Sequence, residues 1–393
     1  MRLTEKSLFM RQQGASGIAA AAVAYTSASK NHLTMVYVDV PGPDMADGNY
    51  QIVSTDNGRT WSAPRPFFTS RKIPGGTEYY NDLAVFLDPV TERLIWTICH
   101  QLKYDPKDGV TPPEKLSMRF AEQDLAADRF TVLATTDFGQ KQAVFISCCF
   151  PLLLNPDKAL LPAKAIMTTP TGEILCHPGS SVARNMQQSL MIVGERLGGR
   201  WKFRLGGRVP ALPMEVSSRG THENSVARLR DGRLAVIMRG SNNQFLERPG
   251  FKWLAFSSDD AETWTKPEPV RWHDGFLMES GANCPGLFRS TKTGKLYFIG
   301  NPCLNGERAK SNWPRSPLVI CEVQEEPFGL RRDRMLVIDQ RQPQDQPKVQ
   351  FSNFRFYEDR ENGELVLFMT RIGERDPAND RNADLYRYRI ELD

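Results

Sequence analysis

Several features that would assign this sequence to a common class are missing. No apolar run approaches the ~18 residues that a membrane-spanning helix requires. The chain has 393 residues, and its 50 Lys and Arg balance 46 Asp and Glu to a net charge of +4. A nucleic-acid-binding protein would show a basic excess, so we expect no nucleic-acid partner and no membrane span.

Cysteine and histidine are also sparse, with seven and five copies, and neither occurs at metal-ligand spacing such as CxxC or HxxxH. We therefore expect no metal site and no cofactor. An odd number of irregularly placed cysteines is typical of reduced thiols in a cytoplasmic protein. The apolar stretch 17–25 follows Lys6 and Arg11, which leaves a secretory signal, and a secreted or periplasmic location, as the alternative.

Turn-forming residues are abundant: 29 Gly and 27 Pro are spread along the chain. They separate short runs of β-branched and aromatic residues, whereas helical periodicity is scarce and is confined to 115–127. Regular short strands with turn signals predict an all-β sandwich, barrel or propeller.

One short pattern occurs twice. The segments 54–61 (STDNGRTW) and 257–264 (SSDDAETW) share the frame S-x-D-x-x-x-T-W. The segment 194–201 (GERLGGRW) is interpreted as a degenerate third copy that keeps the Gly and the Trp. An Asp in this frame can accept backbone N–H bonds and hold a turn, which makes Asp56 and Asp259 structural rather than catalytic. The frame resembles the Asp-box, or BNR, repeat.

That resemblance implies a six-bladed β-propeller of the all-β class, with residues 1–393 forming one domain. We expect the N-terminal strand to complete the last blade. The expected blades are 14–75, 76–145, 160–217, 218–275, 276–345 and 346–393.

A long hairpin is the better functional signal. Residues 221–239 read as a strand, an Asp-Gly turn and a second strand, so Glu223 and Arg239 return to the same end of a blade. This pattern resembles the sialidase family, in which a Glu opens such a hairpin and an Arg closes it. The order of segments 280–288, 294–302 and 315–320 continues the resemblance, which implies that Arg315 is a further substrate-binding arginine.

The resemblance extends to the first two blades. The loop 44–54 resembles the one that carries the acid/base Asp of the family, for which Asp47 or Asp44 is the candidate. Asp82 resembles a residue that lines the site.

Two positions depart from the family pattern. Phe351 stands where the family has a nucleophilic Tyr, and its ring has no oxygen to attack an anomeric carbon. Gly17 stands where the family has its first arginine, which Arg11 could replace only from another direction. A standard Tyr-nucleophile sialidase is therefore not expected.

The remaining residues suggest hydrolysis of an acidic glycan that carries a sialic, other ulosonic or uronic acid. Arg239 and Arg315 would bind the carboxylate, because guanidinium groups offer paired donors. Asp47 as acid and Glu223 as water-activating base would give inversion. We expect burial to raise the pKa of Glu223. Trp313 could stack on a sugar face.

Two other functions stay open. A lyase could remove a proton from a uronate with His222, His100, Tyr79 or Tyr80 as base, while an arginine neutralises the carboxylate. A non-catalytic carbohydrate-binding propeller is the third reading, since two family positions are lost.

Overall fold

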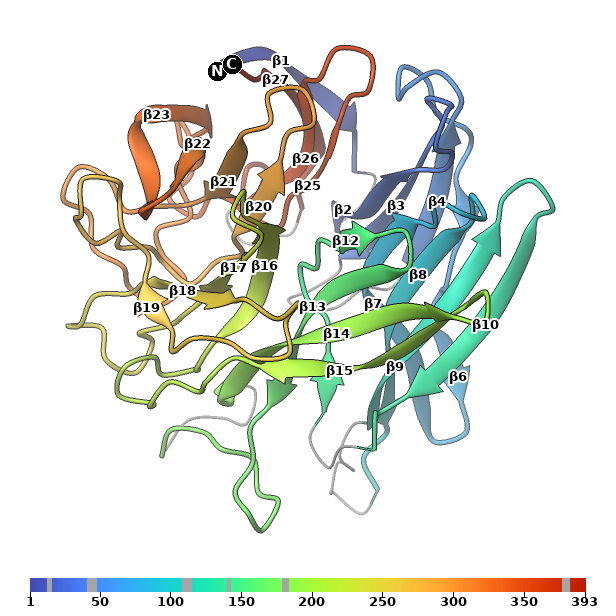
Figure 1. The fold of residues 1–393 in the computed structure, drawn as a ribbon, viewed down its shortest axis with the longest axis horizontal. Coiled ribbons are helices and arrows are strands. Elements are labelled where there is room, and N and C mark those ends of the chain that lie inside the picture. Colours follow the sequence, from blue (N-terminus) through green and yellow to red (C-terminus); the bar gives the residue numbers. More distant parts are fainter. Residues whose placement is uncertain (13–15, 41–47, 108–114, 140–142, 179–183, 377–381) are drawn as a thin grey trace.

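Six antiparallel sheets surround a common axis in this protein (Figure 1). The computed structural model describes residues 1–12, 16–40, 48–107, 115–139, 143–178, 184–376 and 382–393, and these ranges contain no α-helix. Accordingly, no helix in them is long and apolar enough to cross a membrane. The fold is a six-bladed β-propeller, as predicted.

The first three blades follow one another along the chain. Blade one contains β2 (Gly17–Tyr25), β3 (Leu33–Val40), β4 (Gly48–Ser54) and β5 (Arg65–Pro66). Blade two contains β6 (Arg71–Ile73), β7 (Gly76–Leu87), β8 (Leu94–Tyr104), β9 (Lys115–Asp124) and β10 (Arg129–Thr136). Blade three contains β11 (Val144–Phe145), β12 (Leu152–Asn155), β13 (Lys158–Ile166), β14 (Gln187–Leu197) and β15 (Arg200–Arg208).

The other three blades complete the ring. Blade four contains β16 (His222–Arg228), β17 (Leu234–Arg239), β18 (Lys252–Ser257) and β19 (Glu268–Pro269). Blade five contains β20 (Gly286–Arg289), β21 (Leu296–Gly300), β22 (Leu318–Glu325) and β23 (Phe328–Asp339). Blade six contains β24 (Gln350–Phe351), β25 (Arg355–Glu358), β26 (Leu365–Ile372), β27 (Leu385–Glu391) and β1 (Arg2–Met10).

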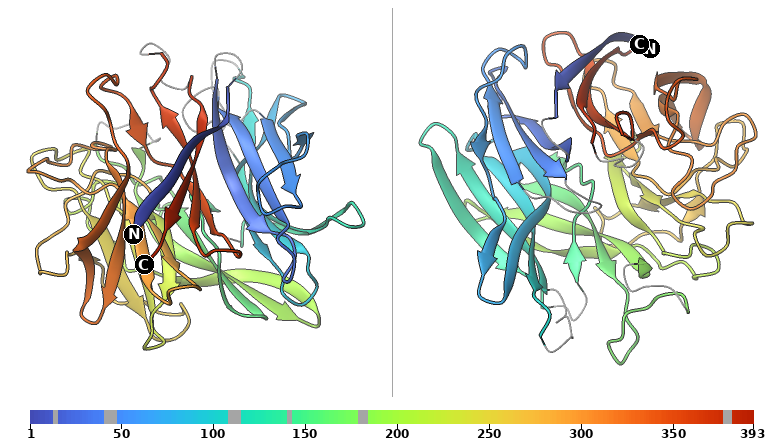
Figure 2. Two further views of the ribbon diagram at one scale, coloured as in Figure 1. Left: turned by 90° about the horizontal axis from the view of Figure 1, so that it is seen from above. Right: turned by 180° about the vertical axis from the view of Figure 1, so that it is seen from behind.

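The ring is closed by strands from opposite ends of the chain. β1 pairs antiparallel with β27, from Arg2 opposite Glu391 to Met10 opposite Leu385. The two ends of the chain therefore lie side by side in all three views (Figures 1 and 2). The expected role of the N-terminal strand is confirmed.

The core consists of six apolar clusters, one at each junction between neighbouring blades. The middle strand β17 shows why its sequence is an unbroken apolar run. Val236 faces the cluster shared with blade three, whereas Ile237 faces the cluster shared with blade five. Since side chains alternate along a strand, a strand covered on both faces is apolar at every position.

The two turns with the repeated frame have the same hydrogen bonds. In each, one Asp oxygen accepts from the first Ser and from the Thr backbone N–H, and the other accepts from the Thr hydroxyl. Asp56 makes these contacts with Ser54 and Thr60 at 2.6–2.9 Å. Asp259 makes them with Ser257 and Thr263 at the same distances. Both turns join the third and fourth strands of a blade.

Three expectations about local structure were wrong. The segment 115–127 is not helical: β9 occupies most of it, because β8 and β10 pair with it on both sides. Blade three begins at Val144 rather than near 160, since β11 and β12 form its inner edge. The segment 194–201 is a tight hairpin in which Gly198 and Gly199, at φ of 58° and 76°, supply the turn.

Candidate functional site

Glu223 and Arg239 lie together at one end of the β16–β17 hairpin. His222 pairs with Arg239 across the ladder, so the residue after His222 comes within reach of the guanidinium. Arg239 donates to the Glu223 carboxylate through Nη1 and to Asn312 Oδ1 through Nη2 at 3.0 Å. Lys164 Nζ, from β13, lies 3.8 Å from the other Glu223 oxygen.

The innermost segments of four blades each place one non-glycine residue in the left-handed region. These residues are Asp82, Cys148, Glu223 and Asn353, at φ of 45°, 50°, 45° and 60°. At Asp82 and Glu223 the strand pairing also shifts register, which is the mark of a β-bulge. Bulges and left-handed residues re-aim side chains and occur often at functional sites.

These re-aimed side chains meet at the axis. Cys284, just before β20, donates to Glu223 Oε2 at 3.1 Å and to Asn353 Oδ1 at 3.7 Å. Cys148 Sγ lies within 4.8 Å of a Glu223 oxygen and of Cys284 Sγ, and the negative charges of Glu223 and Asp82 act on Cys148. The site is thus assembled from blades two, three, four, five and six.

Arg315 enters this site from the segment before β22 without a carboxylate partner among the described residues. It donates to neutral acceptors at 3.0–3.2 Å: Gln350 Oε1, Ser352 Oγ and the backbone oxygens of Ala282 and Asn312. Burial, and then the charge of Arg239, lower the pKa of Arg315 to about 10. A guanidinium held in this way favours an anionic ligand.

Two further basic side chains have no acidic partner in the described part of the chain. Lys252 is fully buried on β18 and donates only to Gly281 O at 2.9 Å. Burial, and then Arg239, lower the pKa of Lys252 to about 7. Arg355 donates to the carbonyls of Ala21 and Phe354. Glu223 is therefore the one described carboxylate that contacts any of five basic groups, which are Lys164, Arg239, Lys252, Arg315 and Arg355.

The pKa of Glu223 shifts in the direction opposite to our expectation. Burial alone would raise it, but the charges of Arg239 and Lys164 outweigh burial and hold the pKa of Glu223 well below its usual range. Glu223 is therefore ionised in the ligand-free protein, and it becomes more basic only if a ligand engages Arg239.

Three other predicted residues occupy distinct surroundings. His222 is buried, its ring nitrogens contact no polar partner among the described residues, and burial holds its pKa well below the usual value. Trp313 is 37% exposed on the segment that also carries Asn312 and Arg315. Phe351 is 0% exposed in the apolar cluster between blades five and six, 5.3 Å from the Arg371 guanidinium, so its ring does not line an open pocket.

The remaining predicted residues are not joined to this cluster by contacts. Arg11 is exposed between β1 and β2, and none of its described contacts reaches Glu223, Arg239 or Arg315. Asp44 and Asp47 lie outside the described residues. The inferences from sequence missed Cys148, Cys284, Asn312 and Lys252, because nothing in their spacing indicates that separate blades bring them together.

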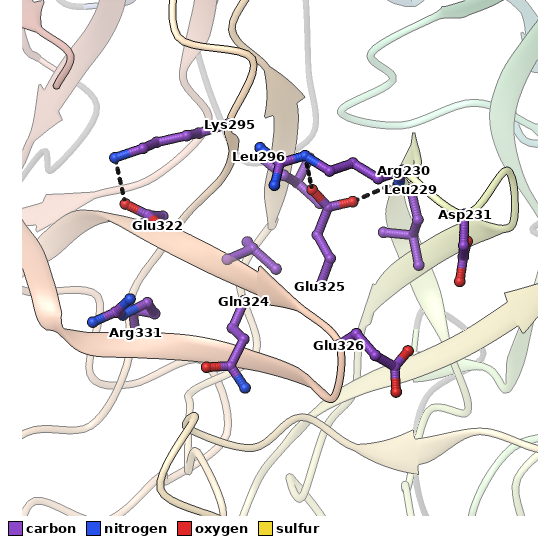
Figure 3. Close-up of a pocket in the computed structure, with 11 residues that line it drawn as sticks. Leu229, Arg230, Asp231, Lys295, Leu296, Glu322, Gln324, Glu325, Glu326 and Arg331 are labelled. Atoms are coloured by element: carbon purple, nitrogen blue, oxygen red, sulfur yellow. Dashed lines mark hydrogen bonds and ion pairs between the residues drawn. The ribbon is translucent and has the colours of Figure 1, made fainter.

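A hollow of about 410 Å³ lies at the opposite end of blades four and five. Figure 3 shows its charged lining beside the Asp231 turn, which is the far end of the β16–β17 hairpin from Glu223. Lys295 pairs with Glu322 at 3.0 Å, and Arg230 pairs with Glu325 at 3.4 Å. The hollow contains none of the predicted site residues.

Comparisons with known proteins agree on the fold. No protein-family model matches the chain, and no curated protein sequence is detectably similar to it. A protein of unknown function from Dyadobacter fermentans aligns with a TM-score of 0.64 at 12% identity, over 100% of this chain and 99% of its own.

Two enzymes are similar in structure over nearly their full lengths. The intramolecular trans-sialidase of Ruminococcus gnavus, solved with oseltamivir carboxylate, has a TM-score of 0.59 at 10% identity, over 98% of this chain and 97% of its own. The α-L-arabinanase of Penicillium chrysogenum, solved with arabinobiose, has a TM-score of 0.57 at 10% identity, over 100% and 99%. The chain therefore has the six-bladed propeller fold of these glycoside hydrolases.

Proposed function

We propose that this protein is a glycoside hydrolase that acts on a glycan with a carboxylate group. The observation that carries the proposal is Arg315, a buried guanidinium whose described partners are all neutral. A substrate carboxylate would supply the missing negative charge and could accept from Arg315 and Arg239 together. Similarity to sialidases adds support, because the sugar they act on carries a carboxylate.

The reacting groups in this proposal are Glu223 and Asp47. A substrate carboxylate that binds Arg239 would replace Glu223 in the ion pair and so raise the pKa of Glu223. Glu223 would then be the base that activates water. Asp47 would protonate the leaving group. Since Phe351 has no hydroxyl, water is the nucleophile, and the anomeric configuration is inverted.

A panel of chromogenic glycosides tests this proposal. The panel contains a sialoside, a second ulosonic-acid glycoside and uronides, with an arabinofuranoside as the neutral reference suggested by the arabinanase similarity. Turnover of an anionic member, with the inverted anomer formed first in proton NMR, is the expected result. Preference for the neutral glycoside would contradict carboxylate recognition, and a retained anomer would contradict water attack.

A lyase is the second candidate, and the state of His222 favours it. The low pKa of His222 keeps the imidazole neutral at pH 7, as a general base requires, and it lies beside Arg239. Elimination on a uronate leaves an unsaturated product that absorbs in the ultraviolet, whereas hydrolysis does not. Binding of the same uronide without any product would instead favour a non-catalytic carbohydrate-binding protein.

A further inference from the structure

Two cysteines and a glutamate converge at the propeller axis. Cys148, Glu223 and Cys284 offer three ligand atoms that all lie within 4.8 Å of one another. They come from blades three, four and five, and 136 residues separate Cys148 from Cys284. Ligands so far apart in the sequence produce no short-range spacing such as CxxC, so the sequence did not indicate this cluster.

We infer that Cys148, Glu223 and Cys284 form a binding site for a thiophilic divalent cation, with Zn²⁺ the best match. Zinc in proteins takes tetrahedral sulfur and oxygen ligands at about 2.0–2.3 Å, so neighbouring ligand atoms lie about 3.3–3.8 Å apart. The 3.1 Å between Cys284 Sγ and Glu223 Oε2 is close to that spacing. Asn353 Oδ1, 3.7 Å from Cys284 Sγ, offers a fourth ligand atom.

The backbone supports this geometry. Cys148, Glu223 and Asn353 are three of the residues in the left-handed region, and the ligand atoms of Cys148 and Glu223 and the side-chain oxygen of Asn353 all lie near Cys284 Sγ. This conformation is unfavourable for non-glycine residues, so it persists where the surrounding structure enforces it. Arg239 donates to the same Glu223 oxygen, Oε2, that Cys284 contacts, and Lys164 lies 3.8 Å from the other oxygen, so both basic groups fix the carboxylate as outer groups do in known metal sites.

The surrounding charge also fits a thiolate site. Each cysteine must lose its proton to bind the ion, so one Zn²⁺ releases two protons from the two thiols. Two thiolates and one carboxylate then leave the centre with one negative charge, which faces Arg239, Lys164 and Arg355.

This site shares Glu223 with the proposed glycan chemistry, but the inference does not rest on that proposal. A Glu223 carboxylate that binds the ion is not free to serve as the base on water. Metal content and glycoside turnover are therefore separate measurements, and either can fail without the other.

The test uses the full chain, purified under reducing conditions and dialysed against Zn²⁺ alone. We expect one zinc per chain by mass spectrometry of the metal, sulfur neighbours in X-ray absorption, and a sulfur-to-metal charge-transfer band when Co²⁺ replaces Zn²⁺. Cys148→Ser and Cys284→Ser should each lower zinc affinity at least 100-fold. Cys176→Ser, which changes a thiol outside the cluster, should leave it unchanged.

Three results would overturn the inference. The first is reduced protein that takes up no zinc, and the second is zinc uptake that survives both cysteine variants. The third is a Cys148–Cys284 disulfide that forms when reductant is omitted, seen as a loss of two hydrogens in the mass of the chain, together with no zinc uptake after this disulfide is reduced. The cobalt and X-ray absorption spectra keep the test decisive if a serine variant fails to fold.

Discussion

The two ends of the β16–β17 hairpin carry similar residues in opposite electrostatic states. At the turn end, Glu325 accepts from Arg289 at 2.8 and 3.0 Å and from the Arg230 backbone at 2.7 Å, and Lys295 pairs with Glu322. At the axial end, Glu223 pairs with Arg239 and Lys164, whereas Lys252, Arg315 and Arg355 have no carboxylate partner among the described residues. Paired charges at the turn end stabilise the blade, whereas unpaired charges at the axial end favour an anionic ligand.

The largest expected effect comes from removing the axial carboxylate. Glu223→Gln should reduce turnover by about 10³-fold, since a positioned general base contributes roughly 10²–10⁴. Glu325→Gln removes a carboxylate from the other end and should leave turnover unchanged. Steady-state kinetics measure both, and circular dichroism checks that both variants fold. Near-normal turnover in Glu223→Gln would exclude a catalytic role for Glu223.

Removing an arginine should affect substrate binding at one end of the hairpin only. Arg315→Met should raise KM for an anionic glycoside about 10–100-fold, because a hydrogen bond to a charged group contributes roughly 1.5–3 kcal/mol. Arg289→Met, which removes a guanidinium paired with Glu325, should leave KM unchanged. Equal KM values in the two variants would mean that the ligand carboxylate does not bind Arg315.

Lysine substitutions should change stability in opposite directions. Lys252→Met removes a buried amine without an acidic partner and should raise the free energy of unfolding by about 1–2 kcal/mol at pH 7. Lys295→Met breaks a half-exposed pair with Glu322 and should lower it by at most about 1 kcal/mol. Urea unfolding measures both. A loss of stability in Lys252→Met would show that its bond to Gly281 O outweighs the cost of burial.

The last prediction concerns how the Lys252 contribution to stability depends on pH. Burial, and then Arg239, lower the folded-state pKa of Lys252 from 10.5 to about 7, so between these values the unfolded chain binds a proton that the folded chain does not. The free energy of unfolding of the wild type should therefore gain from Lys252 as the pH rises from 7 toward 10. The advantage of Lys252→Met should shrink over the same interval, and a constant advantage would contradict the low pKa.

The fold was more predictable from sequence than the site. Turn residues and the S-x-D-x-x-x-T-W frame at Asp56 and Asp259 predict local structure, because a turn depends only on residues within one hairpin. The position of Glu223 beside Arg239 follows in the same way, because a hairpin returns its second strand to the start of the first.

The rest of the site depends on contacts between blades. Nothing near Cys148 in the sequence indicates Cys284, and nothing near Lys252 indicates that its amine would donate to Gly281 O. The pKa direction of Glu223 depends on the balance between burial and two charges, one of them on another blade. The burial of Phe351 depends on how blades five and six pack together.

The pairing of β1 with β27 also bears on how the protein folds. Leu3 lies opposite Ile390, so the sixth blade needs segments separated by nearly the whole sequence. During synthesis β1 emerges long before its partner, and its unpaired edge is exposed to other chains until β27 arrives. Ring closure is therefore a late step. If β27 cannot pair with β1, the other five sheets can form but the ring stays open at the sixth blade.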